Sequence, residues 1–123
     1  MKVGIIGTGW VADLHLNALK LIEGTEVVAI AGRNKVRATE LAQPWKATIY
    51  ETPLSMLKKE ALDAVLILLP PHLHGDLERA CSEHVKGVLV EKPISQSLET
   101  AQAVNGYFKQ AGTIVSVGYM NRY

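Results

Sequence analysis

Short runs of apolar residues recur along the chain and are separated by longer segments of mixed polarity. Residues 63–69 are apolar at almost every position, so both faces of this segment must be covered. Such a run is typical of a strand inside a parallel sheet that has helices on both sides. The same pattern predicts further strands at residues 3–6, 26–31, 47–50, 87–90 and 113–117.

The segments between these runs have the spacing of amphipathic helices. In the first of them, Val11, Leu14, Ala18, Leu19 and Ile22 recur at intervals of three or four, which predicts one apolar helix face. A second helix over residues 35–43 is stopped by Pro44. Further helices are predicted from Pro53 onward, over residues 74–84, and from a cap at Ser95 or Ser97 to Gln110.

The alternation of strands and helices predicts an α/β fold with a doubly wound parallel sheet, the Rossmann arrangement. Right-handed crossovers give the strand order 3-2-1-4-5-6. At 123 residues the chain is long enough for one such domain, which we place at residues 1–123. In sheets of this kind ligands bind beyond the carboxyl ends of the strands.

Composition narrows the class of partner. Lys and Arg total 13 and Asp and Glu total 12, so no strong field attracts nucleic acid or an anionic membrane. No stretch reaches the ~20 apolar residues of a membrane span. Cys81 is the only cysteine, and we interpret it as a buried small hydrophobe in a reducing, cytoplasmic setting. A small molecule is therefore the expected partner.

A glycine-rich turn follows the first predicted strand. Gly7 allows a sharp turn, Gly9 leaves room for a pyrophosphate beside the backbone, and Ala12 lets the following helix pack closely on the strand. The free N–H groups and positive dipole end of that helix then face the anion. Because strand, turn and helix follow in this order, we favour dinucleotide binding over a turn that serves packing alone.

The end of the second strand bears on the choice of dinucleotide. An NAD site usually has an acidic residue there for the ribose 2′-hydroxyl, whereas arginine accommodates a 2′-phosphate. This chain has Gly32, Arg33 and Asn34 at that place. NADP(H) is therefore the preferred cofactor, and NAD(H) remains open because Arg33 could also stack on adenine.

Two histidines stand close together after the fourth strand. The spacing of His72 and His74 could suggest a metal, but no cysteine or further histidine accompanies them, and we predict no metal site. We expect His74 at a helix start near the cofactor and His72 in a loop. His15 is expected to pack under the glycine turn.

Lys92 is the candidate catalytic residue. It follows the fifth strand and precedes Pro93, so its ammonium could hydrogen-bond or polarise a substrate oxygen beside a nicotinamide. Glu91 should point to the opposite side of the extended chain. The alternative interpretation is an ordinary surface lysine, and position alone does not separate the two.

Four motifs together resemble one family. They are residues 7–12 with His15, Pro70 with His74, Glu91-Lys92-Pro93, and residues 118–123. The chain is similar along its whole length to the N-terminal half of the glucose-fructose oxidoreductase and inositol dehydrogenase family (Gfo/Idh/MocA). The resemblance favours Lys92 as a catalytic residue. It implies an NAD(P)-dependent oxidoreductase that transfers hydride to or from a hydroxyl or carbonyl group of a sugar, inositol or related polyol.

The resemblance also implies roles for individual residues. Thr8, Trp10 and Val11 would contact pyrophosphate or ribose through the backbone, and Leu69, Pro70 and His74 would line the nicotinamide side. Glu91 and Lys92 would hold the nicotinamide ribose and the substrate, with Asn121 near the cofactor. Two departures from the family pattern are Pro71, where asparagine is frequent, and Gly32, where an acid is frequent.

Members of this family continue into a second domain that contacts substrate and forms oligomers. We expect a chain ending at residue 123 to bind cofactor without efficient turnover, and to self-associate through the surface that this domain would cover. One alternative is a non-catalytic NAD(P)-binding sensor or interaction module. Another is a dehydrogenase acting on a non-sugar carbonyl.

Overall fold

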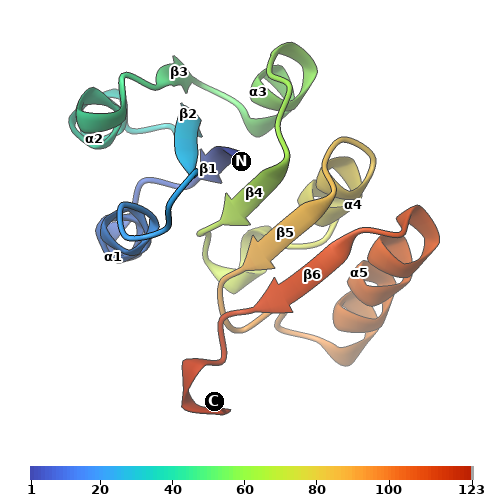
Figure 1. The fold of residues 1–123 in the computed structure, drawn as a ribbon. Helices are drawn as coiled ribbons and strands as arrows, with labels where there is room; N and C mark the ends of the chain where they lie inside the picture. The colour runs from blue at the N-terminus through green and yellow to red at the C-terminus, as the bar shows by residue number, and fades with distance from the viewer. Residues whose placement is uncertain (123) are drawn as a thin grey trace.

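Six parallel strands form a twisted sheet in the order β3-β2-β1-β4-β5-β6 (Figure 1). The computed structural model describes residues 1–122. The predicted Rossmann arrangement and its strand order are confirmed, and every pairing between neighbouring strands is parallel. The strands are β1 (Lys2–Ile6), β2 (Glu26–Ala31), β3 (Thr48–Tyr50), β4 (Ala64–Ile67), β5 (Gly87–Val90) and β6 (Ile114–Val117).

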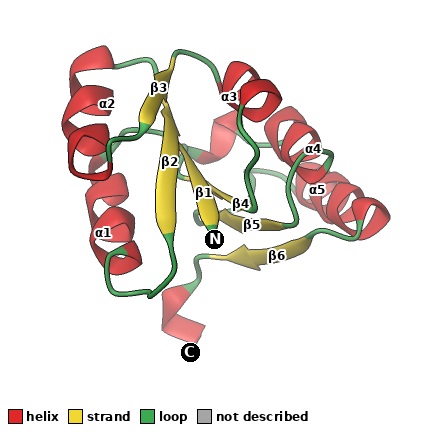
Figure 2. Cartoon of the chain, turned by 45° about the horizontal axis from the view of Figure 1, so that its top comes forward, coloured by secondary structure: helices red, strands yellow, loops and turns green. Residues whose placement is uncertain are grey.

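Helices cover the sheet from both sides. The first two lie on one side and the other three on the opposite side, as Figures 1 and 2 show. The α-helices are α1 (Trp10–Leu19), α2 (Lys35–Ala42), α3 (Pro53–Lys59), α4 (Asp76–Ser82) and α5 (Leu98–Ala111), with short 3-10 turns at η1 (Gln43–Trp45), η2 (Pro71–Leu73) and η3 (Met120–Arg122). None of the helices among residues 1–122 is both long and apolar enough to cross a bilayer.

Alternation along the strands divides the core into two layers. On β1, Val3 and Ile5 pack with Leu16 and Leu19 of α1, whereas Ile6 belongs to the cluster on the other face. That second cluster is centred on α4 and α5 and contains Met56, Cys81, Val104 and Phe108, all at most 1% exposed. The predicted burial of Cys81 is therefore confirmed.

The apolar face predicted for the first helix is confirmed only in part, because Leu19 is buried and Val11 packs against the core. Leu14 is 57% exposed, and Ile22 lies beyond the end of α1 and is 51% exposed. The buried residues of the helix are Ala12, Leu16 and Leu19, of which Leu19 alone belongs to the predicted face. The small side chain of Ala12 lets the first turn approach the sheet closely, and this contact fixes which face is buried.

Local sequence explains most helix ends. Asn34, Thr52 and Ser97 cap α2, α3 and α5, each accepting a hydrogen bond from the backbone N–H three residues later. Of the two caps considered for α5, Ser97 is the one used. The helix predicted over residues 74–84 is shorter, because a 3-10 turn and Gly75 precede it, and the backbone of Gly75 has φ +126°.

Candidate functional site

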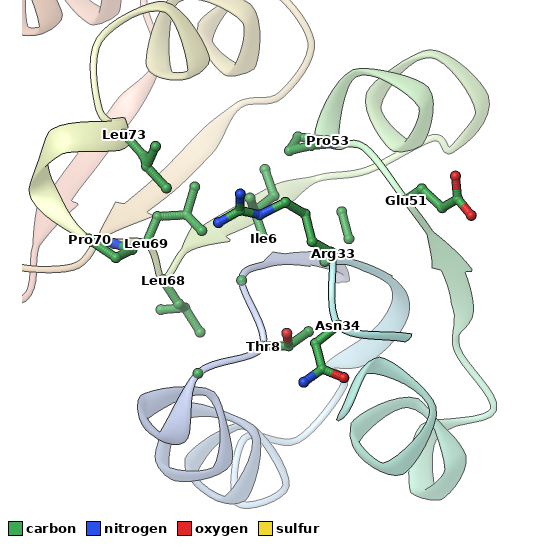
Figure 3. Close-up of a pocket in the computed structure, with 14 residues that line it drawn as sticks. Ile6, Thr8, Arg33, Asn34, Glu51, Pro53, Leu68, Leu69, Pro70 and Leu73 are labelled. Atoms are coloured by element: carbon green, nitrogen blue, oxygen red, sulfur yellow. The ribbon is translucent and has the colours of Figure 1, made fainter. Parts of the chain in front are cut away.

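A pocket of about 360 Å³ lies beyond the carboxyl ends of β1, β2 and β4 (Figure 3). It is at the point where the chain order of the sheet reverses, between β1 and β4. Its walls come from the glycine turn, the loop after β2, the start of α3 and the loop after β4. The lining residues are Ile6, Gly7, Thr8, Gly9, Ala31, Gly32, Arg33, Asn34, Glu51, Pro53, Leu68, Leu69, Pro70 and Leu73.

The two glycines of the turn have different structural roles. Gly7 has φ +108°, and a β-carbon there would lie 2.3 Å from the carbonyl oxygen of Leu68, so no other residue fits. Its N–H donates to the Ala31 carbonyl at 2.9 Å, which ties the turn to β2. Gly9 precedes α1, and a β-carbon there would meet no atom within 4 Å.

The open space beside Gly9 suits a bound anion. As the N-cap residue, Gly9 offers no side-chain oxygen to the first turn of α1. The Ala12 N–H donates to the Gly9 carbonyl at 3.0 Å, and the N–H groups of Trp10 and Val11 remain directed beyond the helix end. This arrangement fits the pyrophosphate of a dinucleotide, which needs backbone donors and no side chain in the way.

Gly32 is packed against the glycine turn. A β-carbon at this position would lie 2.5 Å from Cγ2 of Thr8 and 3.0 Å from its Oγ1. The threonine side chain therefore fills the space that an acidic residue at the end of β2 would need. Thr8 and Gly32 form a complementary pair, a relation that the sequence alone does not reveal.

The basic residues after β2 are not equivalent. Arg37 is held by Asp13 at 2.5 Å and by Glu40 at 2.7 Å, and the hydrogen bond that its guanidinium donates to Glu40 is the main influence that raises its pKa. Lys35 lies 3.4 Å from Glu51, and both are exposed. Arg33, in contrast, forms no ion pair with any described residue, and it projects over the pocket in Figure 3.

The loop after β4 presents its backbone and apolar side chains to the pocket. Leu69, Pro70 and Leu73 line it, whereas the side chain of His74 is completely buried. Nδ1 of His74 pairs with Glu78, and Nε2 lies 3.1 Å from the Leu69 carbonyl oxygen. His74 therefore stands behind the pocket wall rather than on its surface, contrary to the direct cofactor contact expected for it.

A second, larger groove of about 700 Å³ runs beside the first, between α1 and the ends of β5 and β6. Trp10, Val11 and Leu14 contribute an apolar wall, and Glu91 and Lys92 also line the groove. Much of the apolar surface of α1 left exposed by the sheet faces this groove. Gly9, Leu69 and Pro70 line both hollows, which makes them adjacent.

Glu91 connects the groove to the first helix. Its Oε1 lies 2.9 Å from Nε2 of His15, and its Oε2 accepts a hydrogen bond from the Lys92 N–H at 3.0 Å. His15, which was expected to pack under the glycine turn, also has this carboxylate as a partner, a contact that the prediction did not include. Lys92 is exposed, and its bond to Pro93 is cis.

The remaining predictions concern Asn121, the C-terminal motif and metal binding. Asn121 lies in η3, is exposed, and lines neither hollow in the part of the chain that is described. Tyr123, the last residue of its motif, lies outside the described residues. Among residues 1–122 no three His, Cys, Asp or Glu side chains are close enough to hold a metal ion.

The sequence reasoning missed some residues of the site. Glu51 and Pro53 line the first pocket because β3 ends and α3 begins near it. Glu78 was also missed as the partner of His74. A carboxylate four residues after a histidine on one predicted helix is the signal that could have revealed a buried pair.

A family model described as "Oxidoreductase family, NAD-binding Rossmann fold" matches residues 1–119. Curated relatives that align along the whole chain include the 4-carboxy-2-hydroxymuconate-6-semialdehyde dehydrogenase of Sphingobium (33% identical), the scyllo-inositol 2-dehydrogenase (NAD(+)) of Bacillus subtilis (30%) and the D-xylose 1-dehydrogenase (NADP(+)) 2 of Haloferax volcanii (33%). The chain spans 39%, 36% and 38% of their respective lengths.

Solved structures show the same fold. Seven solved chains described as dehydrogenases and one described as a putative NADPH-dependent oxidoreductase superimpose on this chain with TM-scores between 0.89 and 0.93 and sequence identities of 21–28%. The matched region covers 98–100% of this chain and 35–37% of each solved chain. The sheet and both hollows at its carboxyl edge therefore lie on a fold that dehydrogenases share.

Proposed function

This chain belongs to the oxidoreductase family with an NAD-binding Rossmann fold, and we propose that it is the cofactor-binding domain of an NAD(P)-dependent dehydrogenase. The proposed substrate is a hydroxyl or carbonyl compound of the sugar, inositol or related polyol class. The observation that carries the proposal is the position of Lys92 and the open glycine turn on adjacent hollows at one edge of the sheet.

The residues of the first pocket would hold the dinucleotide. The backbone at Thr8, Gly9 and Trp10 would bind the pyrophosphate, and Leu69 and Pro70 would cover the path toward the nicotinamide. When bound, the cofactor supplies or accepts the hydride. The apolar walls would exclude water from the nicotinamide end, as dehydrogenase chemistry requires.

Lys92 would act on the substrate oxygen. It is exposed on the larger groove, and its backbone N–H is held by the Glu91 carboxylate, which fixes where the side chain leaves the strand end. A lysine ammonium in that place can donate a hydrogen bond to a carbonyl oxygen, or stabilise the alkoxide of a hydroxyl that is being oxidised. This position supports the proposal that Lys92 is a catalytic residue.

NADP(H) is the cofactor we propose. Gly32 provides no carboxylate for a ribose 2′-hydroxyl, and Arg33 is the cation over the pocket that forms no ion pair with a described residue. Glu51 lies on the same pocket and forms an exposed ion pair with Lys35 at 3.4 Å. Relatives use either cofactor, since one name states NAD(+) and another NADP(+).

Calorimetric titration with NADPH and NADH in one buffer tests both the site and the cofactor. We expect tighter binding of NADPH, and Arg33→Ala should weaken it about tenfold because charge-assisted bonds to a phosphate are worth ~1.5–3 kcal/mol, with the low end at an exposed site. NADH binding should change little.

Arg79→Ala, which removes an exposed arginine on α4, is the matched control and should leave both affinities unchanged. Equal losses for NADPH and NADH in Arg33→Ala would contradict the NADP(H) assignment. Binding of neither nucleotide by the unmodified chain would contradict the proposed function itself.

A further inference from the structure

Two ionisable side chains are completely buried next to the nucleotide pocket. His74 and Glu78 both have 0% of their side-chain surface exposed. Their contacts form a continuous series of hydrogen bonds. Nε2 of His74 lies 3.1 Å from the Leu69 carbonyl oxygen, and Nδ1 of His74 contacts Oε1 of Glu78. Oε2 of Glu78 accepts a hydrogen bond from the Gly75 N–H at 2.5 Å. Nothing in the proposed chemistry requires a buried ion pair here.

The number of protons in this chain of contacts is constrained. The Leu69 carbonyl can only accept, so Nε2 of His74 must carry a proton to bond it. Glu78 accepts from Gly75 and, as a carboxylate, also accepts from Nδ1. Both ring nitrogens are then donors, and the ring is an imidazolium. Beside a Glu78 carboxylate, a neutral ring would leave its Nδ1 lone pair facing an oxygen.

The contacts also determine which backbone the pair holds. Leu69 begins the loop whose Pro70 and Leu73 line the dinucleotide pocket, and Leu73 N–H donates to the Pro70 carbonyl at 3.0 Å within the same turn. At the other end, Glu78 fixes Gly75, whose φ of +126° marks the sharp entry into α4. The histidine therefore fastens the pocket wall to the helix behind it.

We propose that His74 is a positioning residue, which holds the pocket wall through the Leu69 carbonyl only while the His74–Glu78 pair retains its extra proton. Deprotonation releases one of the two ring contacts and loosens the wall. Dinucleotide affinity then falls as pH rises. The inference rests on the proposed function, because the wall is a cofactor contact only if the first pocket binds a dinucleotide.

The direction of the titration agrees with this geometry. Burial lowers the pKa of His74, but the hydrogen bond and charge of Glu78 and the contact with Leu69 together outweigh it and raise the pKa above its ordinary value. A raised folded-state pKa means that the pair contributes its full stability below about pH 6.5, the ordinary histidine value. The contribution is lost as pH rises through the folded-state pKa.

No other charged group competes closely for this proton. Glu78 is the charge that acts on His74, and Cys81, buried one turn further along α4, is the other titratable group that Glu78 influences. Among the remaining titratable groups on α4 and on the elements packed against it, Tyr107 and Glu91 are half-buried. The others are exposed: Asp76, Arg79, Glu83, His84, Lys58, Lys59, Lys86, Glu99 and Lys109.

Glu78→Gln removes the charge of the carboxylate but keeps a side chain of the same shape. A glutamine amide can donate to a neutral Nδ1 and its oxygen can still accept from Gly75, while Nε2–H keeps its bond to Leu69. All three contacts then survive without the extra proton. Asp76→Asn is the matched control, because it neutralises an exposed carboxylate on the same turn of α4.

The experiment measures NADP⁺ affinity from pH 6 to 9 in the three proteins, together with ¹⁵N NMR of the histidine rings. We expect the dissociation constant of the unmodified chain and of Asp76→Asn to rise about 3- to 10-fold over this range, more than in Glu78→Gln. The NMR spectra should show both nitrogens of His74 protonated at pH 7 in the unmodified chain, and only Nε2 in Glu78→Gln.

Three results would overturn the proposal. They are a neutral His74 ring at pH 7 in the unmodified chain, identical pH profiles for the unmodified chain and Glu78→Gln, or amide hydrogen exchange at Leu73 that is equally fast in both proteins across the pH range. If no dinucleotide binds at any pH, the proposed function fails. The ring spectra and the exchange rates at Leu73 still decide whether the pair holds the loop. If Glu78→Gln does not fold, the ring titration of the unmodified chain decides alone.

Discussion

Nε2 of His15 lies 2.9 Å from Oε1 of Glu91, so the first helix and the end of the fifth strand are joined at the edge of the larger groove. The other carboxylate oxygen accepts the Lys92 N–H. Glu91 therefore points toward α1 and does not extend into solvent. A β-carbon at Gly118 would lie only 3.3 Å from Oε1, so β6 also limits where this side chain lies.

Glu91→Ala should lower the free energy of unfolding by about 1–3 kcal/mol, because it removes the acceptor from a part-buried histidine and from a backbone N–H. Urea denaturation followed by circular dichroism measures this change. Glu23→Ala, which removes an exposed carboxylate in the turn after α1, should change stability by less than about 0.5 kcal/mol. Equal effects of the two substitutions would contradict a structural role for the His15–Glu91 contact.

The sheet could be predicted from sequence because strands buried on both faces leave an unambiguous apolar pattern. The apolar run at residues 63–69 and the glycine turn predicted the central strands and the site at their carboxyl ends. The face of α1 could not be predicted in this way. Leu14 is apolar yet exposed on the groove, and the close approach to the sheet is made by the small Ala12.

Side-chain pairs between distant segments were beyond the sequence reasoning. His15 and Glu91 are 76 residues apart, and no local periodicity links them. The packing of Thr8 into the space beside Gly32 depends on how two neighbouring strands end, which is a property of the folded sheet. The glycine turn could be predicted from neighbouring residues alone, whereas predicting these contacts requires knowledge of the register between the strands.

The Thr8–Gly32 pair predicts a coupled effect of substitution. Gly32→Ala should destabilise the protein by about 1–3 kcal/mol, since its β-carbon would lie 2.5 Å from Thr8 Cγ2. Thr8→Ala should remove most of that cost, and a double-mutant cycle on unfolding free energies measures the coupling. Additive effects would show that the two side chains do not compete for one space.

The same pair predicts how cofactor preference could be changed. Gly32→Asp together with Thr8→Ala should shift binding toward NADH, because an acid at the end of β2 can accept from a ribose 2′-hydroxyl and repels a 2′-phosphate. Gly32→Asp alone should fold poorly for the steric reason already given. The ratio of the NADPH and NADH dissociation constants is the measurement, and an unchanged ratio in the double variant would contradict this account of the pocket.

Cys81 should be unreactive in the folded protein. Burial, with a smaller contribution from the charge of Glu78, raises the pKa of its thiol to about 12. At pH 8 the thiol is therefore almost entirely protonated, and the reactive thiolate is scarce. Alkylation by iodoacetamide should be slow in buffer and fast in denaturant, with a rate in buffer that follows unfolding. Rapid labelling of the folded chain would contradict the burial of this side chain.

The two glycines of the turn should separate folding from cofactor binding. Gly7→Ala should cost about 3 kcal/mol or more, because it combines a positive φ with a contact of 2.3 Å to a backbone carbonyl that cannot move freely. Gly9→Ala meets open space and should change stability by no more than about 1 kcal/mol. Thermal denaturation of both variants measures this difference.

Gly9→Ala, which should change stability little, should instead have a large effect on cofactor affinity. Its new methyl group would occupy the space where a pyrophosphate approaches the backbone, so NADPH binding should weaken about tenfold or more in a protein that is still folded. Calorimetric titration of Gly9→Ala beside Gly106→Ala, a control on α5 in which a β-carbon also meets open space and φ is not positive, isolates this effect from a general loss of glycine. Undiminished affinity in Gly9→Ala would mean that the pyrophosphate does not lie against this turn, and would place the dinucleotide elsewhere on the sheet edge.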